Sequence, residues 1–300
     1  MKLIIQPDEG LTPLLQAVKR AKRSVDIVIF RFDRPEMEKA LAAAVARGVA
    51  VRALIAHTNR GGEKNLRKLE QRLLGVGVIV ARTADDLTRY HSKMMIVDDT
   101  LHVLGFNYTR LDIERSRSFG VVTRDKRLVK EALTLFNADC TRQPYSNGHD
   151  RFVVSPECSR KLLTAFISGA KQQLLIYNVR VSDRMILRTL EERQKAGVEI
   201  RIIGKVEKGL AAVETRKLAN LRLHVRAIIR DGAAFFVGSQ SLRKLELDGR
   251  REVGVIVSNP TAAKKIAAVF EADWAASQPP VAPEREVADA EEPILASAAR

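Results

Sequence analysis

Residues 91–107 read HSKMMIVDDTLHVLGFN, and a related stretch, HVRAIIRDGAAFFVGSQS, occupies residues 224–241. Each stretch joins two apolar runs through an aspartate-containing turn, which predicts a β-hairpin. Side chains two residues apart share one face of a strand, so His91 should point with Lys93, and His224 with Arg226. Buried cations are costly unless they are paired. These side chains are therefore expected to face solvent or to line a working pocket.

The two stretches belong to a longer internal repeat. An offset of 149 residues pairs Pro7 with Pro156 and continues along the first third of each half. The hairpins follow at an offset of 133, and FNADC at residues 136–140 matches FEADW at residues 270–274 at an offset of 134. Matching blocks in the same order predict two similar structural units.

Each half alternates strand-like and helix-like segments. In the first half, SVDIVIFRF at residues 24–32 predicts a buried strand, EMEKALAAAVARG at 36–48 a helix, and VAVRALIA at 49–56 another strand. This alternation predicts an α/β architecture with a largely parallel sheet. We expect one lobe over residues 1–145 and a second over residues 151–276.

The charge indicates a polyanionic partner. The chain has 51 Lys and Arg against 36 Asp and Glu, a formal net charge of +15. Residues 277–300 hold five acidic residues, two arginines and few large apolar ones, so they are expected to form a disordered tail. The remaining body carries +18, which favours nucleic acid or anionic lipid. An ordinary excess of surface Lys and Arg would give the same composition.

Other bulk features argue against several protein classes. No run of about 18 apolar residues could span a bilayer. The first ten residues, MKLIIQPDEG, turn polar too early for a secretory signal. Cys140 and Cys158 form neither a disulfide framework nor a metal-ligand cluster. We expect a cytoplasmic protein, with peripheral contact to a membrane left open.

Each hairpin aspartate lies an odd number of residues after its motif histidine, so the two side chains should not share a strand face. Asp98 and Asp231 sit at the two turns, where they should accept turn N–H groups or brace the neighbouring side chains. A glycine follows each aspartate after seven residues, and Asn107 comes two residues after the first glycine. In the second half the corresponding polar position is Gln240 or Ser241.

These motifs resemble those of the phospholipase D superfamily, whose signature is His-x-Lys-x4-Asp followed by a Gly-x-x-Asn-like turn. The resemblance extends to about Ser277. It implies two α/β lobes related by a pseudo-twofold axis, with one active site at their interface and one motif from each lobe. It also implies that one histidine forms a phosphohistidine, that the other protonates the leaving group, and that no metal or cofactor is needed.

The resemblance assigns His91 as the nucleophile and His224 as the general acid, since the first motif is the more complete. Both roles suit imidazole, whose ordinary pKa is about 6.5. Lys93 and Arg226 would stabilise the charge of the phosphoryl oxygens. The candidate catalytic set is His91, Lys93, Asp98, Asn107, His224, Arg226, Asp231 and Glu252.

The second motif departs from the family pattern. Arg226 replaces the lysine, and a guanidinium is not interchangeable with an ammonium group. The family also has a glutamate that orients a histidine; the second half has it as Glu252, which would stand behind His224. The first half has Ser118 at this point, with Glu114 nearby as a substitute.

Further candidates concern substrate binding. Arg31 and Arg180 are equivalent in the repeat, and each follows an apolar strand. Ligands gather at the carboxyl ends of such strands, so both arginines are expected to flank the phosphate pocket, although ordinary surface ion pairs would explain them equally. Ser239 and Ser241 complete the predicted substrate-binding set.

Three functions remain open. The first is a phospholipase D-type phosphodiesterase or phosphatidyltransferase that acts on phospholipids through a phosphohistidine. The second is a metal-independent nuclease on the same fold, which the charge of the body favours, although aromatic residues make up only 5% of the chain. The third is a binding protein for polyanions that has lost turnover. With both motifs in one chain, a monomer is expected.

Overall fold

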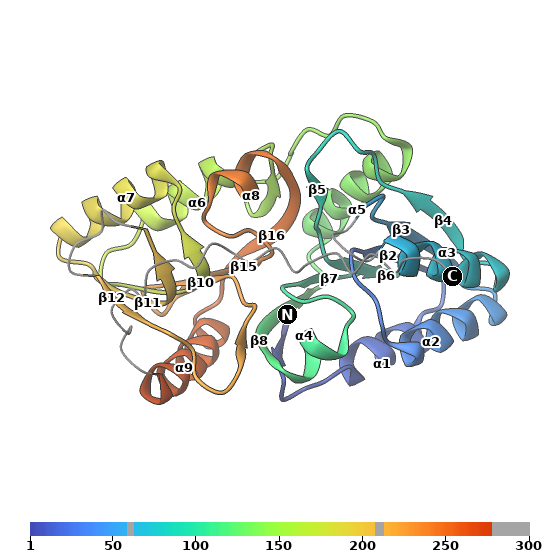
Figure 1. Cartoon of the computed structure of the whole chain (residues 1–300), viewed down its shortest axis with the longest axis horizontal. Helices are drawn as coiled ribbons and strands as arrows, with labels where there is room; N and C mark the ends of the chain where they lie inside the picture. The colour runs from blue at the N-terminus through green and yellow to red at the C-terminus, as the bar shows by residue number, and fades with distance from the viewer. Residues whose placement is uncertain (59–62, 208–212, 278–300) are drawn as a thin grey trace, which may run out of the picture.

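The computed structural model describes residues 1–58, 63–207 and 213–277 and shows two α/β lobes side by side (Figure 1). The expected disordered tail lies, except for Ser277, outside the described residues. The first lobe contains, in chain order, β1 (Lys2–Gln6), α1 (Thr12–Arg20), β2 (Ser24–Ile29), α2 (Pro35–Ala46), β3 (Ala50–Ile55), α3 (Glu63–Gly75), β4 (Ile79–Arg82), β5 (Arg89–Tyr90), β6 (Met94–Val97), β7 (Thr100–Leu104), α4 (Arg110–Glu114), β8 (Ser116–Thr123) and α5 (Lys126–Thr141).

The second lobe repeats this order, except that no helix corresponding to α3 occurs among its described residues. It contains β9 (Phe152–Ser155), α6 (Ser159–Ser168), β10 (Gln173–Val181), α7 (Arg184–Lys195), β11 (Glu199–Val206), β12 (Glu214–Arg216), β13 (Arg222–Leu223), β14 (Ala227–Arg230), β15 (Ala234–Gly238), α8 (Lys244–Asp248), β16 (Arg250–Ser258) and α9 (Pro260–Ala276). Matching elements lie on opposite sides of the centre of Figure 1, α4 below and α8 above, α5 on the right and α9 on the left. The two lobes are therefore related by a pseudo-twofold arrangement, as expected.

Each lobe is built on a mixed sheet. The strand order is β1-β8-β7-β6-β2-β3-β4 in the first lobe and β12-β11-β10-β14-β15-β16 in the second, where β9 also pairs with β16. β2, β3 and β4 pair in parallel, whereas β2-β6, β6-β7, β7-β8 and β8-β1 are antiparallel. The expectation of a largely parallel sheet is wrong, because strands joined by a tight hairpin turn must run antiparallel. The two hairpins themselves are confirmed.

A short strand from each lobe joins the sheet of the other. β5 pairs in parallel with β16, and β13 pairs in parallel with β8. Each of these strands ends one residue before a motif histidine, and the N–H of His91 donates to the carbonyl of Arg251 at 2.8 Å. The exchange therefore holds each histidine against a strand of the opposite lobe.

Two buried arginines lock the lobes together in a matching way. Arg117 donates to both oxygens of Asp273 at 2.8 and 3.0 Å, and Arg251 donates to Asp139 at 3.2 Å. Each arginine also donates to a carbonyl at the end of the first strand of its own lobe, that of Gln6 or Ser155. Both ion pairs cross the interface, and Arg251 is held in addition by Glu157 of its own lobe at 2.5 Å.

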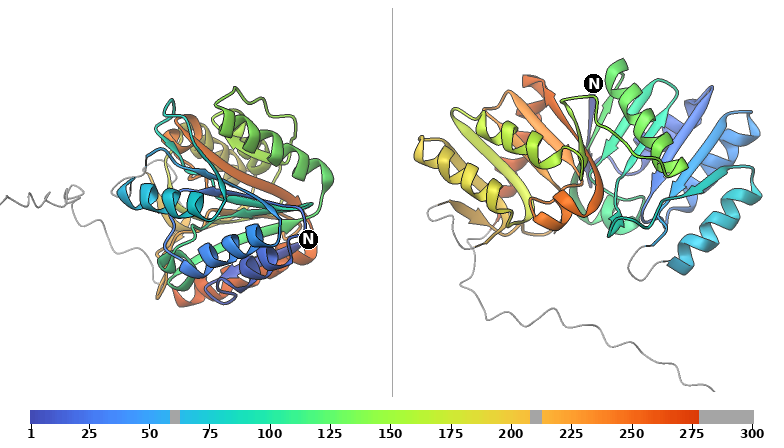
Figure 2. Two further views of the ribbon diagram at one scale, coloured as in Figure 1. Left: turned by 90° about the vertical axis from the view of Figure 1, so that its right-hand side faces the viewer. Right: turned by 90° about the horizontal axis from the view of Figure 1, so that it is seen from above.

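The interface is also apolar. One buried cluster draws on β6, β7 and β8 of the first lobe and on β14, β15 and β16 of the second. Its aromatic contacts include Phe119 with Tyr177 and Tyr177 with Phe270, at ring-centroid distances of 5.7 and 5.0 Å. Separate clusters fill the space under α1–α3 and under α6–α7, whose helices cover the outer faces in Figure 2.

A buried histidine in β7 makes the stability of the protein sensitive to acid. His102 is 3% exposed, and burial lowers its pKa to about 4, against about 6.5 in an unfolded chain. Between these values the unfolded state binds more protons, so the free energy of unfolding should fall as the pH drops, by about 3 kcal/mol in total. His102→Gln removes this titration. Urea denaturation at several pH values between 7.5 and 4.5 should show a flatter pH dependence for the variant; an unchanged slope would contradict the assignment.

Candidate functional site

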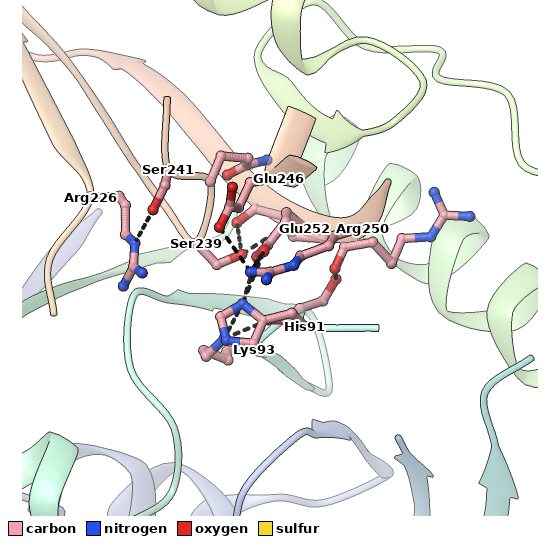
Figure 3. A network of polar contacts seen from close by, with 12 residues as sticks. His91, Lys93, Arg226, Ser239, Ser241, Glu246, Arg250 and Glu252 are labelled. Carbon is pink, nitrogen blue, oxygen red and sulfur yellow. Dashed lines mark hydrogen bonds and ion pairs between the residues drawn. The ribbon is translucent and has the colours of Figure 1, made fainter. Parts of the chain in front are cut away.

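The two histidine motifs meet at the junction of the lobes (Figure 3). His91 and Lys93 lie just before β6, and His224 and Arg226 just before β14. Lys93 Nζ is 3.0 Å from His91 Nδ1 and donates to the His91 carbonyl at 2.5 Å. The ring of Phe30 packs edge-on against His91 at 4.5 Å. Both histidines and Lys93 are buried, which is consistent with a pocket rather than an exposed strand face.

A glutamate from the second lobe holds the histidine of the first. Glu252 is fully buried, and its two oxygens lie 3.0 and 2.9 Å from His91 Nδ1. The expectation that this carboxylate would stand behind His224 is wrong, because β5 carries His91 across to β16. When Glu252 is ionised it can only accept hydrogen bonds, so Nδ1 then donates to it and Nε2 carries the lone pair, while Lys93 donates to the His91 carbonyl.

Asp112 supplies the carboxylate nearest to His224, and sequence reasoning missed it. Its Oδ2 lies 3.7 Å from His224 Nδ1 and accepts the N–H and the Nδ2 of Asn107 at 2.8 and 2.6 Å. Its Oδ1 accepts from Arg222 at 2.6 Å. Glu114, the substitute favoured earlier, instead binds Arg34 and Arg110 at the surface. A signal was present, since an acidic residue follows the polar turn position by five residues in both halves.

The two lobes use this acidic position differently. In the second lobe it is Glu246, which is held by Arg243 and Arg250. In the first lobe the positions of these arginines are Thr109 and Ser116, and Asp112 is held instead by Asn107 and by Arg222 of the other lobe, with its Oδ2 facing His224. At the position that corresponds to Glu252, the hydroxyl of Ser118 is buried and has no hydrogen-bond partner among the described residues.

The strand register identifies the counterpart of Asn107. The first hairpin turn has two residues between Val97 and Thr100, whereas the second has three between Arg230 and Ala234. Beyond the turn the offset is therefore 134, which aligns Asn107 with Ser241 rather than with Gln240.

Burial and the neighbouring cations disfavour the protonated forms of both histidines and of Lys93. Burial, together with Lys93 and Arg226, lowers the pKa of His91 well below its ordinary value. Burial and Arg226 also lower the pKa of His224, which Asp112 opposes. Burial lowers the pKa of Lys93 to about 7 and raises the pKa of Glu252 to about 7.

Two cations remain available for an anion. Arg226 is partly exposed and donates to Ser241 Oγ at 3.1 Å and to the His224 carbonyl at 2.6 Å. Within the described part of the chain, neither Arg226 nor Lys93 forms an ion pair with a carboxylate. Ser239 lies beside Glu252, and its hydroxyl exchanges hydrogen bonds with the backbone of Val253 at 3.3 and 3.2 Å.

The two hairpin aspartates are not brought to this cluster. Asp98 and Asp231 have φ angles of 49° and 52°, and their carboxylates accept N–H groups from the loops that precede β2 and β10. Their grouping with the catalytic residues is therefore corrected: they anchor a loop to the hairpin turn in each lobe.

The two repeat-related arginines differ in their surroundings. Arg31 is exposed and packs over Phe30, the ring that contacts His91, so it borders the site. Arg180 forms an ion pair with Glu207, and its side chain is 43% exposed.

No group of three or more His, Cys, Asp or Glu suited to a metal ion occurs in residues 1–58, 63–207 and 213–277. In the same ranges, no helix has both the length and the apolar character needed to cross a membrane.

Comparisons with known proteins agree with this arrangement. The model of a family described as "Cardiolipin synthase, PLD-like domain" matches residues 14–140 and 163–274. No curated protein sequence matches the chain.

Two of the solved structures that match share the fold over 90% of this chain. Polyphosphate kinase from Porphyromonas gingivalis has a TM-score of 0.76 at 18% identity, over 90% of this chain and 46% of that chain, so the present chain spans about half of that protein. Phosphatidylserine synthase from Haemophilus influenzae has a TM-score of 0.65 at 10% identity, over 90% of this chain and 85% of that chain. Nuc from Salmonella typhimurium, a phospholipase D family member, has a TM-score of 0.43 at 25% identity, over 47% of this chain and 93% of that chain.

The placement of Asp112 can be tested without any assay of turnover. Asp112→Asn removes the negative charge next to His224, so the pKa of His224 should fall further, which NMR of the imidazole signals would measure. Adding Ser118→Glu restores a carboxylate at the position that corresponds to Glu252 and should raise the pKa of His224 again. Glu114→Gln is the matched control and should leave the His224 signals unchanged. An Asp112→Asn variant with an unshifted His224 would refute the pairing.

Proposed function

The chain belongs to the phospholipase D-like family, as its resemblance implied, and from this premise we propose that it cleaves or exchanges a phospholipid phosphodiester through a covalent intermediate on His91. One observation carries the choice of His91. Glu252 contacts its Nδ1 at 2.9 Å, whereas the nearest carboxylate oxygen lies 3.7 Å from Nδ1 of His224. The closer carboxylate fixes the tautomer and makes Nε2 the better nucleophile.

In the first step, the lone pair of His91 Nε2 attacks phosphorus. A P–N bond forms while the bond from phosphorus to the leaving alcohol oxygen breaks, and His224 donates a proton to that oxygen. For this step His224 must be protonated. Burial disfavours its charged form in the empty site, and the negative charge of a bound phosphodiester together with Asp112 would offset this effect.

In the second step, the neutral His224 accepts a proton from water or from a second alcohol. The resulting oxygen attacks phosphorus, the P–N bond breaks, and the electron pair returns to His91 Nε2. Water gives hydrolysis and an alcohol gives transfer. The same two histidines serve both outcomes, so the balance between them depends on which acceptor reaches the pocket.

Lys93 and Arg226 stabilise the phosphoryl oxygens in both steps. Their positive charges are oriented in advance, by the His91 carbonyl for Lys93 and by Ser241 for Arg226. Groups that are already positioned need no reorganisation as charge develops, which is the main source of this kind of stabilisation.

The reaction and its substrate class can be tested with one panel. We expect chelator-treated protein to turn over anionic phospholipid and to form an acid-labile, base-stable phosphoprotein when it is quenched during turnover. His91→Ala should abolish both signals, while His149→Ala, a histidine between the lobes, should change neither. Turnover of DNA or RNA in place of lipid would reassign the enzyme as a nuclease. No turnover of any class would indicate a polyanion-binding protein.

The ionisation of Lys93 predicts the alkaline side of the pH profile. Its pKa of about 7 means that the ammonium form exists below this value and is lost above it. Binding of the anionic substrate should therefore weaken as the pH rises, and kcat/KM should fall about tenfold per unit once the pH exceeds about 7. Lys93→Arg keeps the charge at high pH, so the decline should become shallower, with only the part caused by loss of the His224 proton remaining. Arg226→Lys retains Lys93 and should keep the full decline of kcat/KM at high pH. A Lys93→Arg profile identical to that of the wild type would contradict the role of Lys93.

A further inference from the structure

The two short helices beside the site repeat an unusual pattern. α4 reads RLDIE and α8 reads KLELD, so each has a cation, a leucine, an acid, an apolar residue and an acid in the same order. The third and fourth side chains are buried in both helices. The first two are exposed: the side chains of Arg110 and Lys244 are 74% and 83% exposed, and Leu111 and Leu245 are 48% and 44% exposed.

Both helices border the active site. Asp112 of α4 contacts Asn107 and lies beside His224, and Glu246 of α8 binds Arg250, which lies beside Glu252. In Figure 1 the helices stand on either side of the junction between the lobes. The pseudo-twofold arrangement therefore places one exposed leucine and one exposed cation on each side of the site.

Two other exposed apolar side chains belong to segments near α8. Val179 and Met185 are 37% and 52% exposed. They flank the segment whose N–H groups, at Ser182 and Asp183, donate to the carbonyl of Leu242 just before α8. Isolated exposed apolar residues are common, but a group that surrounds a site indicates an interaction surface.

The chemistry of this surface favours lipid over nucleic acid. Binding of single-stranded nucleic acid relies on aromatic side chains that stack on bases, whereas the exposed residues here are aliphatic. Basic residues lie close by: Arg31, Arg115 and Arg222 are exposed, and the body of the chain carries a net charge of +18. Aliphatic side chains next to Arg and Lys are typical of segments that lie in the interface of an anionic membrane.

We propose that α4 and α8 form a twin docking surface, on which Leu111 and Leu245 enter the headgroup region of an anionic phospholipid bilayer. This inference rests on the proposed function and deepens it, because it delivers the interlobe site to phosphodiesters at the membrane surface. The cations beside the leucines, Arg110 and Lys244, pair with Glu114 and Asp248 in the free protein and exchange these partners for lipid phosphates at the bilayer. The two contact points orient the junction between the lobes toward the bilayer.

The test is co-sedimentation of the full chain with phosphatidylglycerol–phosphatidylcholine vesicles. The wild type should bind, and binding should weaken at least tenfold in the Leu111→Ser/Leu245→Ser variant. Leu74→Ser/Ile79→Ser is the matched control, since these side chains are 52% and 64% exposed on α3 and β4, and it should bind within twofold of the wild type. Absence of wild-type binding, or equal losses in both variants, would overturn the proposal.

A second measurement separates this proposal from the proposed function. Turnover of bis(p-nitrophenyl) phosphate, a soluble phosphodiester, should be the same in the wild type and in the Leu111→Ser/Leu245→Ser variant, which also shows that the variant is folded. Vesicle binding that depends on the two leucines supports docking even if the protein turns over no phosphodiester. Turnover that survives while vesicle binding ignores the leucines overturns docking and leaves the reaction intact.

Discussion

The contact between Glu252 and His91 crosses from one lobe to the other, and the working geometry of the site depends on it. The carboxylate is fully buried, so it is costly unless it accepts hydrogen bonds, and His91 Nδ1 is its close partner at 2.9 Å. This contact requires β5 to lie against β16. Docking of the two lobes thereby gives the buried carboxylate of Glu252 its partner, and the same contact favours one tautomer of His91.

Two arginine–aspartate ion pairs further from the site also require the two lobes to be docked. Arg117 reaches Asp273 and Arg251 reaches Asp139, so each lobe holds a guanidinium that pairs with a carboxylate of the other, and Arg251 also pairs with Glu157 of its own lobe. Breaking a buried pair leaves an uncompensated charge, which costs about 3–5 kcal/mol. Together with the apolar cluster that both lobes share, these pairs fix how the two lobes pack against each other. A rigid junction is what a site assembled from two lobes requires, because displacements of about 1 Å already impair catalysis.

The site itself is not symmetric, although the fold is. One histidine is held by a glutamate at hydrogen-bond distance, whereas the other has an aspartate at 3.7 Å. The cations differ as well. Burial lowers the pKa of Lys93 to about 7, whereas the pKa of Arg226 is lowered from a higher ordinary value. Substitutions at a few equivalent positions, Ser118 for Glu252 and Thr109 for Arg243 among them, separate the environments of two imidazoles that the repeat would otherwise make alike. Unequal environments suit a nucleophile and an acid.

The sequence by itself determined the repeat and the two lobes, because matching blocks recur in the same order at offsets of 149, 133 and 134. It also determined the hairpins and the histidine and cation pairs, because these depend on spacing within one short segment. It misjudged the sheet as largely parallel and placed Glu252 behind the wrong histidine. It also overlooked Asp112, whose neighbour Glu114 has the same charge but lies at the surface, whereas Asp112 is buried. Only the tertiary structure decided which carboxylate meets which imidazole, since that pairing arises from β5 and β13 joining the opposite sheets, a contact between residues some 160 positions apart in the case of His91 and Glu252.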